Sequence, residues 1–234
     1  MKTRPLIKAG FVGLILIISS LFMMQTFPKK AVYMSEGFVT PIIYFEFVES
    51  PIEVYDFFGI SSETSANEDF IAKMDYGNKL DFGFAFIYSF FLVFLFWSIF
   101  KLSNNKVYII AIILAVFAFV FDVLENVQLL SITSKLNSGD FSSEIINLQI
   151  FTWIKWGSLA LIFLIFAYWI YFNRAAKYVA IISVLPFILG VLAFIDKGLM
   201  TEIFAKSISA MFAISVFYTF FYKKLKLDNK NKTS

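Results

Sequence analysis

The chain has 234 residues, of which 59% are hydrophobic and only 16% are charged, and its formal net charge is +3. A soluble domain carries about 25% charged residues, so this composition indicates a membrane protein. The sequence contains no Cys and no His, which excludes disulfides, thiol catalysis and the commonest ligands of zinc, copper and haem; it therefore predicts no metal site and no cofactor.

The apolar residues form six blocks near the length of a helix that crosses a bilayer core, about 20 residues. We expect spans near residues 6–26, 82–100, 107–131, 148–172, 178–195 and 203–222. Little sequence remains outside them, so residues 1–234 are expected to form one integral membrane domain of the all-α class, a polytopic helix bundle. The alternative for the first block is a cleaved signal peptide, although no small-x-small cleavage site follows it.

Residues 28–80 are the one long segment between spans, and we expect them to be extracytoplasmic and to form short amphipathic helices. Three start signals place a capping residue before a proline or before an acid, at Thr40-Pro41, Ser50-Pro-Ile-Glu53 and Ser65-Ala-Asn-Glu68. Gly59 and Gly77 are expected to end the second and the third of these helices.

The basic residues predict the orientation, because Lys and Arg are enriched in cytoplasmic loops. A cytoplasmic N-terminus places 12 of the 20 basic residues and one acid, Asp228, on the inner side. We therefore expect an inner (plasma) membrane protein with both termini in the cytoplasm. This distribution also explains the positive net charge, and no exposed segment interleaves clustered arginines with aromatic residues, so a nucleic-acid partner is not expected.

The third block contains the most unusual polar residues of the chain, Asp122, Glu125 and Asn126. Their i, i+3, i+4 spacing places them on one helix face. Alanines one, two and three turns earlier continue this face, and small residues permit close helix packing in membranes. The acids are therefore expected to point into the bundle. Ionisable residues inside a membrane are candidates for function.

Two neighbouring blocks carry polar residues at a similar depth. The fourth block contains Lys155, and the second begins at Asp81 with Tyr88 two turns further on. We expect these residues to meet the acids of the third block in a pocket near the outer surface, covered by the short helices that include Glu46. Two carboxylates within one helical turn require a shared proton or a cation in a low dielectric, and Lys155 is the nearest cation in depth.

Structural alternatives remain open for these residues. Lys155 could extend to the outer interface, Asp81 could cap a helix start, and Glu46 could belong to a solvated face. Asp122 and Glu125 could form an ion pair with Lys155 that fixes helix register without further function. Three tryptophans are typical of the interfacial belt: Trp153, Trp156 and Trp169.

The order of these motifs resembles a family of uncharacterised bacterial multi-pass membrane proteins that share a TP…FE…LD…Y…DxxEN…K layout. The matching positions are Thr40-Pro41, Phe45-Glu46, Leu80-Asp81 with Tyr88, Asp122-x-x-Glu125-Asn126, and Lys155. The resemblance covers roughly residues 40–160. It implies a membrane protein in which these residues matter, and it implies no particular reaction.

The leading functional hypothesis is an outward-facing pocket that binds a lipid or another amphiphilic small molecule, with the head group at the acids and the apolar tail among the phenylalanines. One alternative is an intramembrane enzyme, an acid/base isomerase or lipid transferase that uses the carboxylates. Others are a proton- or cation-coupled transporter, against which stands the lack of an internal repeat, and a structural or accessory subunit. Membrane lipids are the expected partners.

Overall fold

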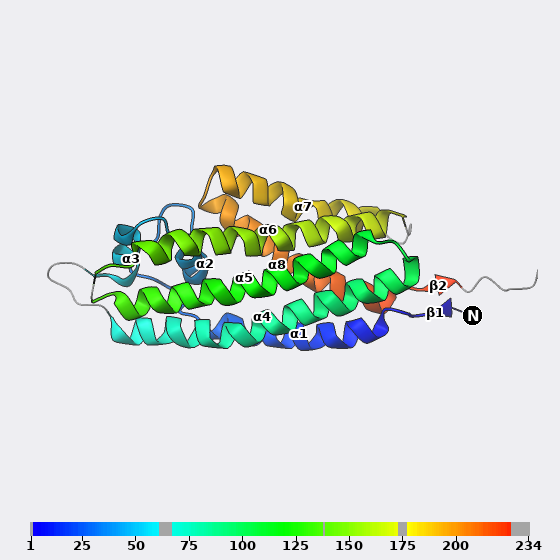
Figure 1. The fold of residues 1–234 in the computed structure, drawn as a ribbon, viewed down its shortest axis with the longest axis horizontal. Coiled ribbons are helices and arrows are strands. Elements are labelled where there is room, and N and C mark those ends of the chain that lie inside the picture. Colours follow the sequence, from blue (N-terminus) through cyan, green and yellow to red (C-terminus); the bar gives the residue numbers. More distant parts are fainter. Residues whose placement is uncertain (1, 61–66, 138, 173–176, 226–234) are drawn as a thin grey trace, which may run out of the picture.

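A computed structural model describes residues 2–60, 67–137, 139–172 and 177–225 (Figure 1). The helices are α1 (Ile7–Thr26), α2 (Pro41–Glu46), α3 (Pro51–Phe58), α4 (Glu68–Ser103), α5 (Val107–Lys135), α6 (Ser142–Phe172), α7 (Lys177–Ile195) and α8 (Leu199–Phe221). Six of them, α1 and α4 to α8, are long and apolar enough to cross a membrane. The predicted class, an all-α bundle with six candidate spans, is confirmed.

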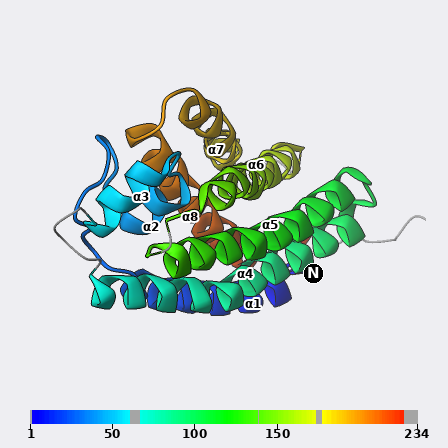
Figure 2. The same cartoon turned by 60° about the vertical axis from the view of Figure 1, so that its left-hand side comes forward.

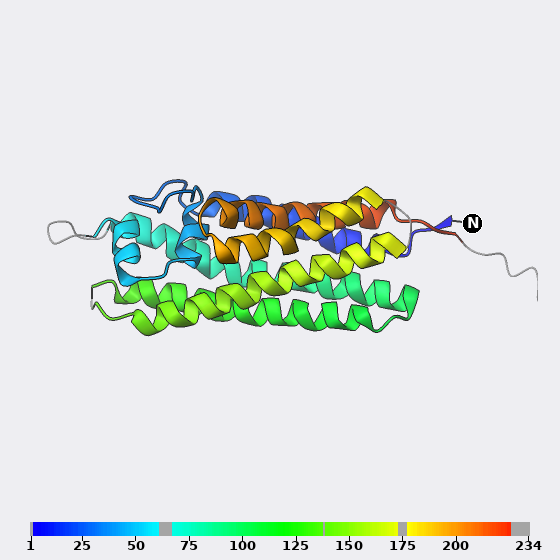
Figure 3. The same cartoon turned by 90° about the horizontal axis from the view of Figure 1, so that it is seen from above.

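The long helices lie side by side along one axis (Figures 1 and 3). The short helices α2 and α3 lie at one end of this bundle, and the first and last described residues lie at the other end. Two short strands, β1 (Lys2–Thr3) and β2 (Lys224–Leu225), pair antiparallel and bring the start and the end of the described chain together. We call this the basic end of the bundle, and the other the α2–α3 end. Figure 2 shows α2 and α3 packed beside α5 and α8 at that end.

Helix α4 is longer than the predicted second span because the expected stop at Gly77 is wrong. Gly77 lies inside α4, where a Cβ atom would be 2.3 Å from the ring of Phe27. The glycine therefore allows the chain that follows α1 to pack closely against α4. The third predicted short helix is the first part of α4. Asn67 caps α4, since its side chain accepts a hydrogen bond from the Phe70 N–H at 3.1 Å. The predicted cap Ser65 lies outside the described residues.

Helix α3 begins and ends as its sequence predicts. The Ser50 hydroxyl accepts a hydrogen bond from the Glu53 N–H at 3.3 Å, and Gly59 ends the helix with φ of 70°, in the left-handed region. Aromatic side chains fasten α3 to α2, since Phe45 stacks on Phe57 with ring centroids 5.3 Å apart and both are buried. The two short helices thus pack as one unit on the bundle.

Helix α2 begins after Thr40 as predicted, but the Thr40 hydroxyl does not cap it. The hydroxyl instead donates to Glu202 of α8 at 2.8 Å. The other Glu202 oxygen accepts the backbone N–H groups of Val39 and Thr40 at 2.9 and 2.6 Å. A carboxylate from the last long helix therefore holds the start of α2 against the bundle.

Candidate functional site

Four helices, α2, α4, α5 and α6, contribute to a buried polar network that we call the acid–lysine cluster. It contains all seven residues singled out from the sequence, together with two further side chains of α6. Its members are Glu46, Asp81, Tyr88, Asp122, Glu125, Asn126 and Lys155, with Thr152 and Trp156.

Lys155 lies at the centre of the cluster. Its Nζ forms an ion pair with Glu125, and it is 3.3 Å from Glu46 Oε2 and 3.9 Å from Asp122 Oδ1. The Lys155 side chain is 5% exposed, so the alternative in which it extends to the outer interface is wrong. It projects between α5 and α2 because α6 packs against both.

Hydrogen bonds to Asp122 and to Asp81 join helices α4 and α5. The Tyr88 hydroxyl donates to Asp122 Oδ2 at 2.7 Å. The Asn126 amide donates to Asp81 at 2.8 Å and to Asp122 Oδ1 at 3.2 Å. Asp81 lies well inside α4, so its interpretation as a helix-start acid is wrong. Asp122 is therefore shared between a phenol, an amide and the ammonium group of Lys155.

Two cluster residues of α6 were not among the sequence candidates. The Thr152 hydroxyl lies within hydrogen-bonding distance of Glu125 Oε1 and of the Glu46 carbonyl oxygen, and the Trp156 Nε1–H donates to Glu46 Oε2 at 2.9 Å. The spacing contained part of the signal, since Thr152 lies three residues before Lys155 on the same helix face and Trp156 lies four residues after Thr152. The expectation that Trp156 is an interfacial belt residue is wrong because its side chain is buried and hydrogen-bonded. Trp169, also assigned to the belt, is buried too.

Glu46 is the cluster member whose burial depends most on tertiary structure. The solvated-face interpretation is wrong for this residue, which is 6% exposed, whereas the nearby Glu49 is exposed and pairs with Lys197. Burial raises the pKa of Glu46 above the usual range of a glutamate, and the adjacent Lys155 ammonium offsets only part of this effect.

The cluster holds more carboxylates than cations. Three carboxylates, from Glu46, Asp122 and Glu125, contact the ammonium of Lys155, and it is the one cation that contacts them within the described part of the chain. A fourth carboxylate, from Asp81, joins the cluster through the Asn126 amide. Buried negative charge requires compensation, so shared protons or donor groups of a ligand would stabilise this arrangement. Among the described residues, no group of three or more acidic side chains is arranged to hold a metal ion.

A cavity of about 170 Å³ lies at the α2–α3 end. Tyr44 and Phe47 line it from α2 and its C-cap, and Glu49 and Lys197 lie on its rim. None of the cluster residues lines this cavity. Because α2 presents Tyr44 to the cavity and Glu46 to the cluster, α2 forms the wall between them. Comparisons with protein-family models, with curated proteins and with solved structures found no match to this chain, so the interpretation of the site depends on its geometry.

Proposed function

We propose that this is an inner-membrane protein with cytoplasmic termini that binds the head group of a lipid or another amphiphilic small molecule at the acid–lysine cluster. The observation that carries the proposal is the charge balance, since three buried carboxylates contact one buried ammonium and a fourth, the half-buried Asp81, is hydrogen-bonded to the same network. A fold stabilised by packing alone has no need of such a group, because burying it opposes folding unless every charge is compensated.

The composition of the cluster indicates the chemistry of the head group. Because the cluster holds more carboxylates than cations, it favours a head group with amine or hydroxyl groups. These groups would donate hydrogen bonds to the carboxylates in place of the protons that the acids share. Aromatic rings next to the cluster provide apolar surface for the part of the ligand beyond its head group. Trp156 packs on Phe204 with ring centroids 5.6 Å apart, and Tyr88 packs on Phe212 at 5.7 Å.

Helix α2 is the element that would open the site. It is only six residues long, and it separates the cluster from the cavity at the α2–α3 end. Its polar attachments include the hydrogen bonds of Glu202 to its start, the contacts of the Glu46 side chain with Trp156 and Lys155, and the hydrogen bond from the Thr152 hydroxyl to the Glu46 carbonyl oxygen. Displacement of α2 would connect the cavity to the carboxylates without unpacking a span.

The test compares amphiphiles that remain bound to the purified full-length chain. Wild type, Asp122→Asn and Glu125→Gln would be extracted from membranes in a mild detergent, and their bound lipids identified by mass spectrometry. We expect one amphiphile enriched in wild type and lost from both variants, with Glu68→Gln, an exposed acid of α4, as the matched control. Equal lipid content in all four folded proteins would refute the proposal, and loss of folding in both cluster variants would favour the structural ion pair.

A second candidate function, an intramembrane acid/base enzyme, is favoured by the unlike surroundings of two neighbouring carboxylates. Asp122 accepts a hydrogen bond from the Tyr88 phenol, whereas Glu125 pairs directly with Lys155. Unlike environments are how one carboxyl group serves as acid and its neighbour as base. Lipid profiling of a deletion strain separates the two functions, because loss of an enzyme leaves an accumulated precursor and loss of a binding protein does not.

The proposed orientation has its own test, which the absence of cysteine in the chain makes simple. Single cysteines at Lys29 and Lys106, which are exposed on opposite ends of the bundle, would be treated with a membrane-impermeant maleimide. We expect labelling of the Lys29→Cys variant in spheroplasts, and of the Lys106→Cys variant only after the membrane is disrupted. The reverse pattern would contradict the orientation.

A further inference from the structure

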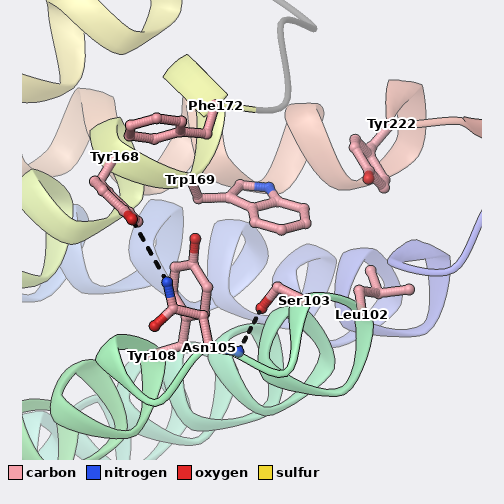
Figure 4. A pocket seen from close by; sticks show the side chains of 8 residues that line it. All are labelled: Leu102, Ser103, Asn105, Tyr108, Tyr168, Trp169, Phe172 and Tyr222. Carbon is pink, nitrogen blue, oxygen red and sulfur yellow. Dashed lines mark hydrogen bonds between the residues drawn. The ribbon is translucent and has the colours of Figure 1, made fainter.

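A larger cavity, of about 330 Å³, lies at the basic end, and none of the acid–lysine cluster residues lines it. Figure 4 shows the side chains that line this cavity. The cavity forms where the turn between α4 and α5 meets the last turns of α6 and the end of α8. The residues that line it are Leu102, Ser103, Asn105, Tyr108, Tyr168, Trp169, Phe172 and Tyr222. None of them takes part in the proposed function.

The walls of this basic-end pocket are mainly aromatic, and its rim is polar and held in place. The Asn105 amide donates to the Tyr168 hydroxyl at 3.5 Å, and the Asn105 backbone N–H donates to the Ser103 hydroxyl at 3.3 Å. Figure 4 shows the hydroxyls of Tyr108 and Tyr168 on the same side of the pocket as the Asn105 amide. The pocket thus presents several hydroxyl and amide groups between aromatic rings.

Exposed cations adjoin the lining residues in sequence. Lys106 follows Asn105, and Lys223 follows Tyr222. In the described residues of the α4–α5 turn, of the last turn of α6 and of the segment after α8, there is no acid to neutralise them. Among the described residues next to the pocket lining, the charged side chains are therefore all cations, which favours an anionic ligand.

We propose that the basic-end pocket binds the head group of an anionic glycerophospholipid, with its phosphate near Lys106 and Lys223 and its polyol hydroxyls at Asn105 and Tyr108. Tyrosine rings beside lysines at the end of a membrane-spanning helix are typical of the membrane interface, where phospholipid head groups lie. The adjacent Phe172 is 63% exposed and provides apolar surface for the glycerol and the first acyl carbons. A free inorganic anion would gain nothing from these aromatic walls.

The experiment titrates the full-length chain in a non-ionic detergent with three probes: dihexanoyl phosphatidylglycerol, dihexanoyl phosphatidylcholine and inorganic phosphate. The readouts are tryptophan emission, because Trp169 lines the pocket, and the midpoint of thermal unfolding. We expect a saturable response to phosphatidylglycerol and none to the other two probes at equal concentration. A response of equal affinity to phosphatidylcholine or to inorganic phosphate would overturn the proposal.

Two variants separate a pocket from attraction to surface charge. Lys106→Gln with Lys223→Gln should weaken phosphatidylglycerol binding about thirtyfold, since each lysine contributes about 1 kcal/mol. Ser103→Phe keeps every charge but places a ring in the pocket, and it should abolish the saturable response. The matched control removes two exposed lysines near the opposite end, Lys29→Gln with Lys30→Gln, and should leave the affinity unchanged.

The pocket proposal fails if Ser103→Phe retains wild-type affinity while the lysine variant loses it, since the lipid would then only collect near surface charge. If Ser103→Phe does not fold, Asn105→Ala takes its place, with a loss of about threefold or more expected and unchanged affinity as the contradicting result. Glu68→Gln, which removes an exposed acid outside both sites, should bind phosphatidylglycerol like wild type.

Discussion

Replacement of Lys155 by methionine tests the charge balance of the acid–lysine cluster most directly. Methionine keeps most of the length and apolar volume of the side chain and removes its ammonium group. Glu46, Asp122 and Glu125 then lose the cation that all three contact. Removing one partner of a buried ion pair typically costs about 3–5 kcal/mol, because the remaining charge stays buried without compensation.

The expected loss is large enough to measure by thermal unfolding in detergent. For a chain of this size, 1 kcal/mol corresponds to about 2–4 °C, so the midpoint of Lys155→Met should fall by roughly 6–20 °C at pH 8. The matched control is Lys197→Met, which removes the partner of the exposed Glu49 and should cost less than about 1 kcal/mol.

The pH dependence of the Lys155→Met variant follows from the direction of the Glu46 shift. Burial raises the pKa of Glu46, and loss of the ammonium that offsets part of this effect raises it further. The folded variant therefore binds protons that the unfolded chain does not, so its stability should rise as the pH falls from 8 to 5. Addition of Glu125→Gln to Lys155→Met should restore part of the stability at pH 8. A single variant as stable as wild type at both pH values would refute this account of the cluster.

Two further predictions concern the packing around the site. Gly77→Ala should destabilise the protein by about 1–3 kcal/mol in thermal unfolding, because its Cβ would overlap the ring of Phe27, whereas Gly83→Ala has open space around it and should be neutral or stabilising. An unfolding midpoint for Gly77→Ala at or above that of Gly83→Ala would contradict the close approach. Thr40→Val should cost about 1 kcal/mol and should speed proteolysis in the α2 region, because Glu202 loses the hydroxyl that helps to hold α2. Unchanged proteolysis of Thr40→Val would show that Glu202 holds α2 through the backbone N–H groups alone.

Much of the cluster could be predicted from helical periodicity. The spacing of Asp122, Glu125 and Asn126 defines one face of α5 regardless of the rest of the fold. Lys155 lies at a similar depth on the next span of an antiparallel pair, so its proximity to that face was expected from a count of residues along the two spans. Six apolar blocks likewise determine six candidate spans, because no other structure satisfies the backbone of such long apolar segments in lipid.

Contacts between residues distant in sequence could not be predicted in this way. Gly77 looks like a helix stop in isolation, yet α4 continues through it. A glycine suits this position because the Phe27 ring packs where a side chain would otherwise lie. Glu46 looks solvated on its short helix, and it is buried because Glu202, far along the chain, holds α2 so that Glu46 meets Trp156 and Lys155. The sequence by itself determined the spans and the acidic face of α5, since these follow from local period and length. Only the tertiary structure decided that the Glu46 carboxylate joins the cluster and that α2 closes it, because both depend on hydrogen bonds between helices that no local pattern encodes.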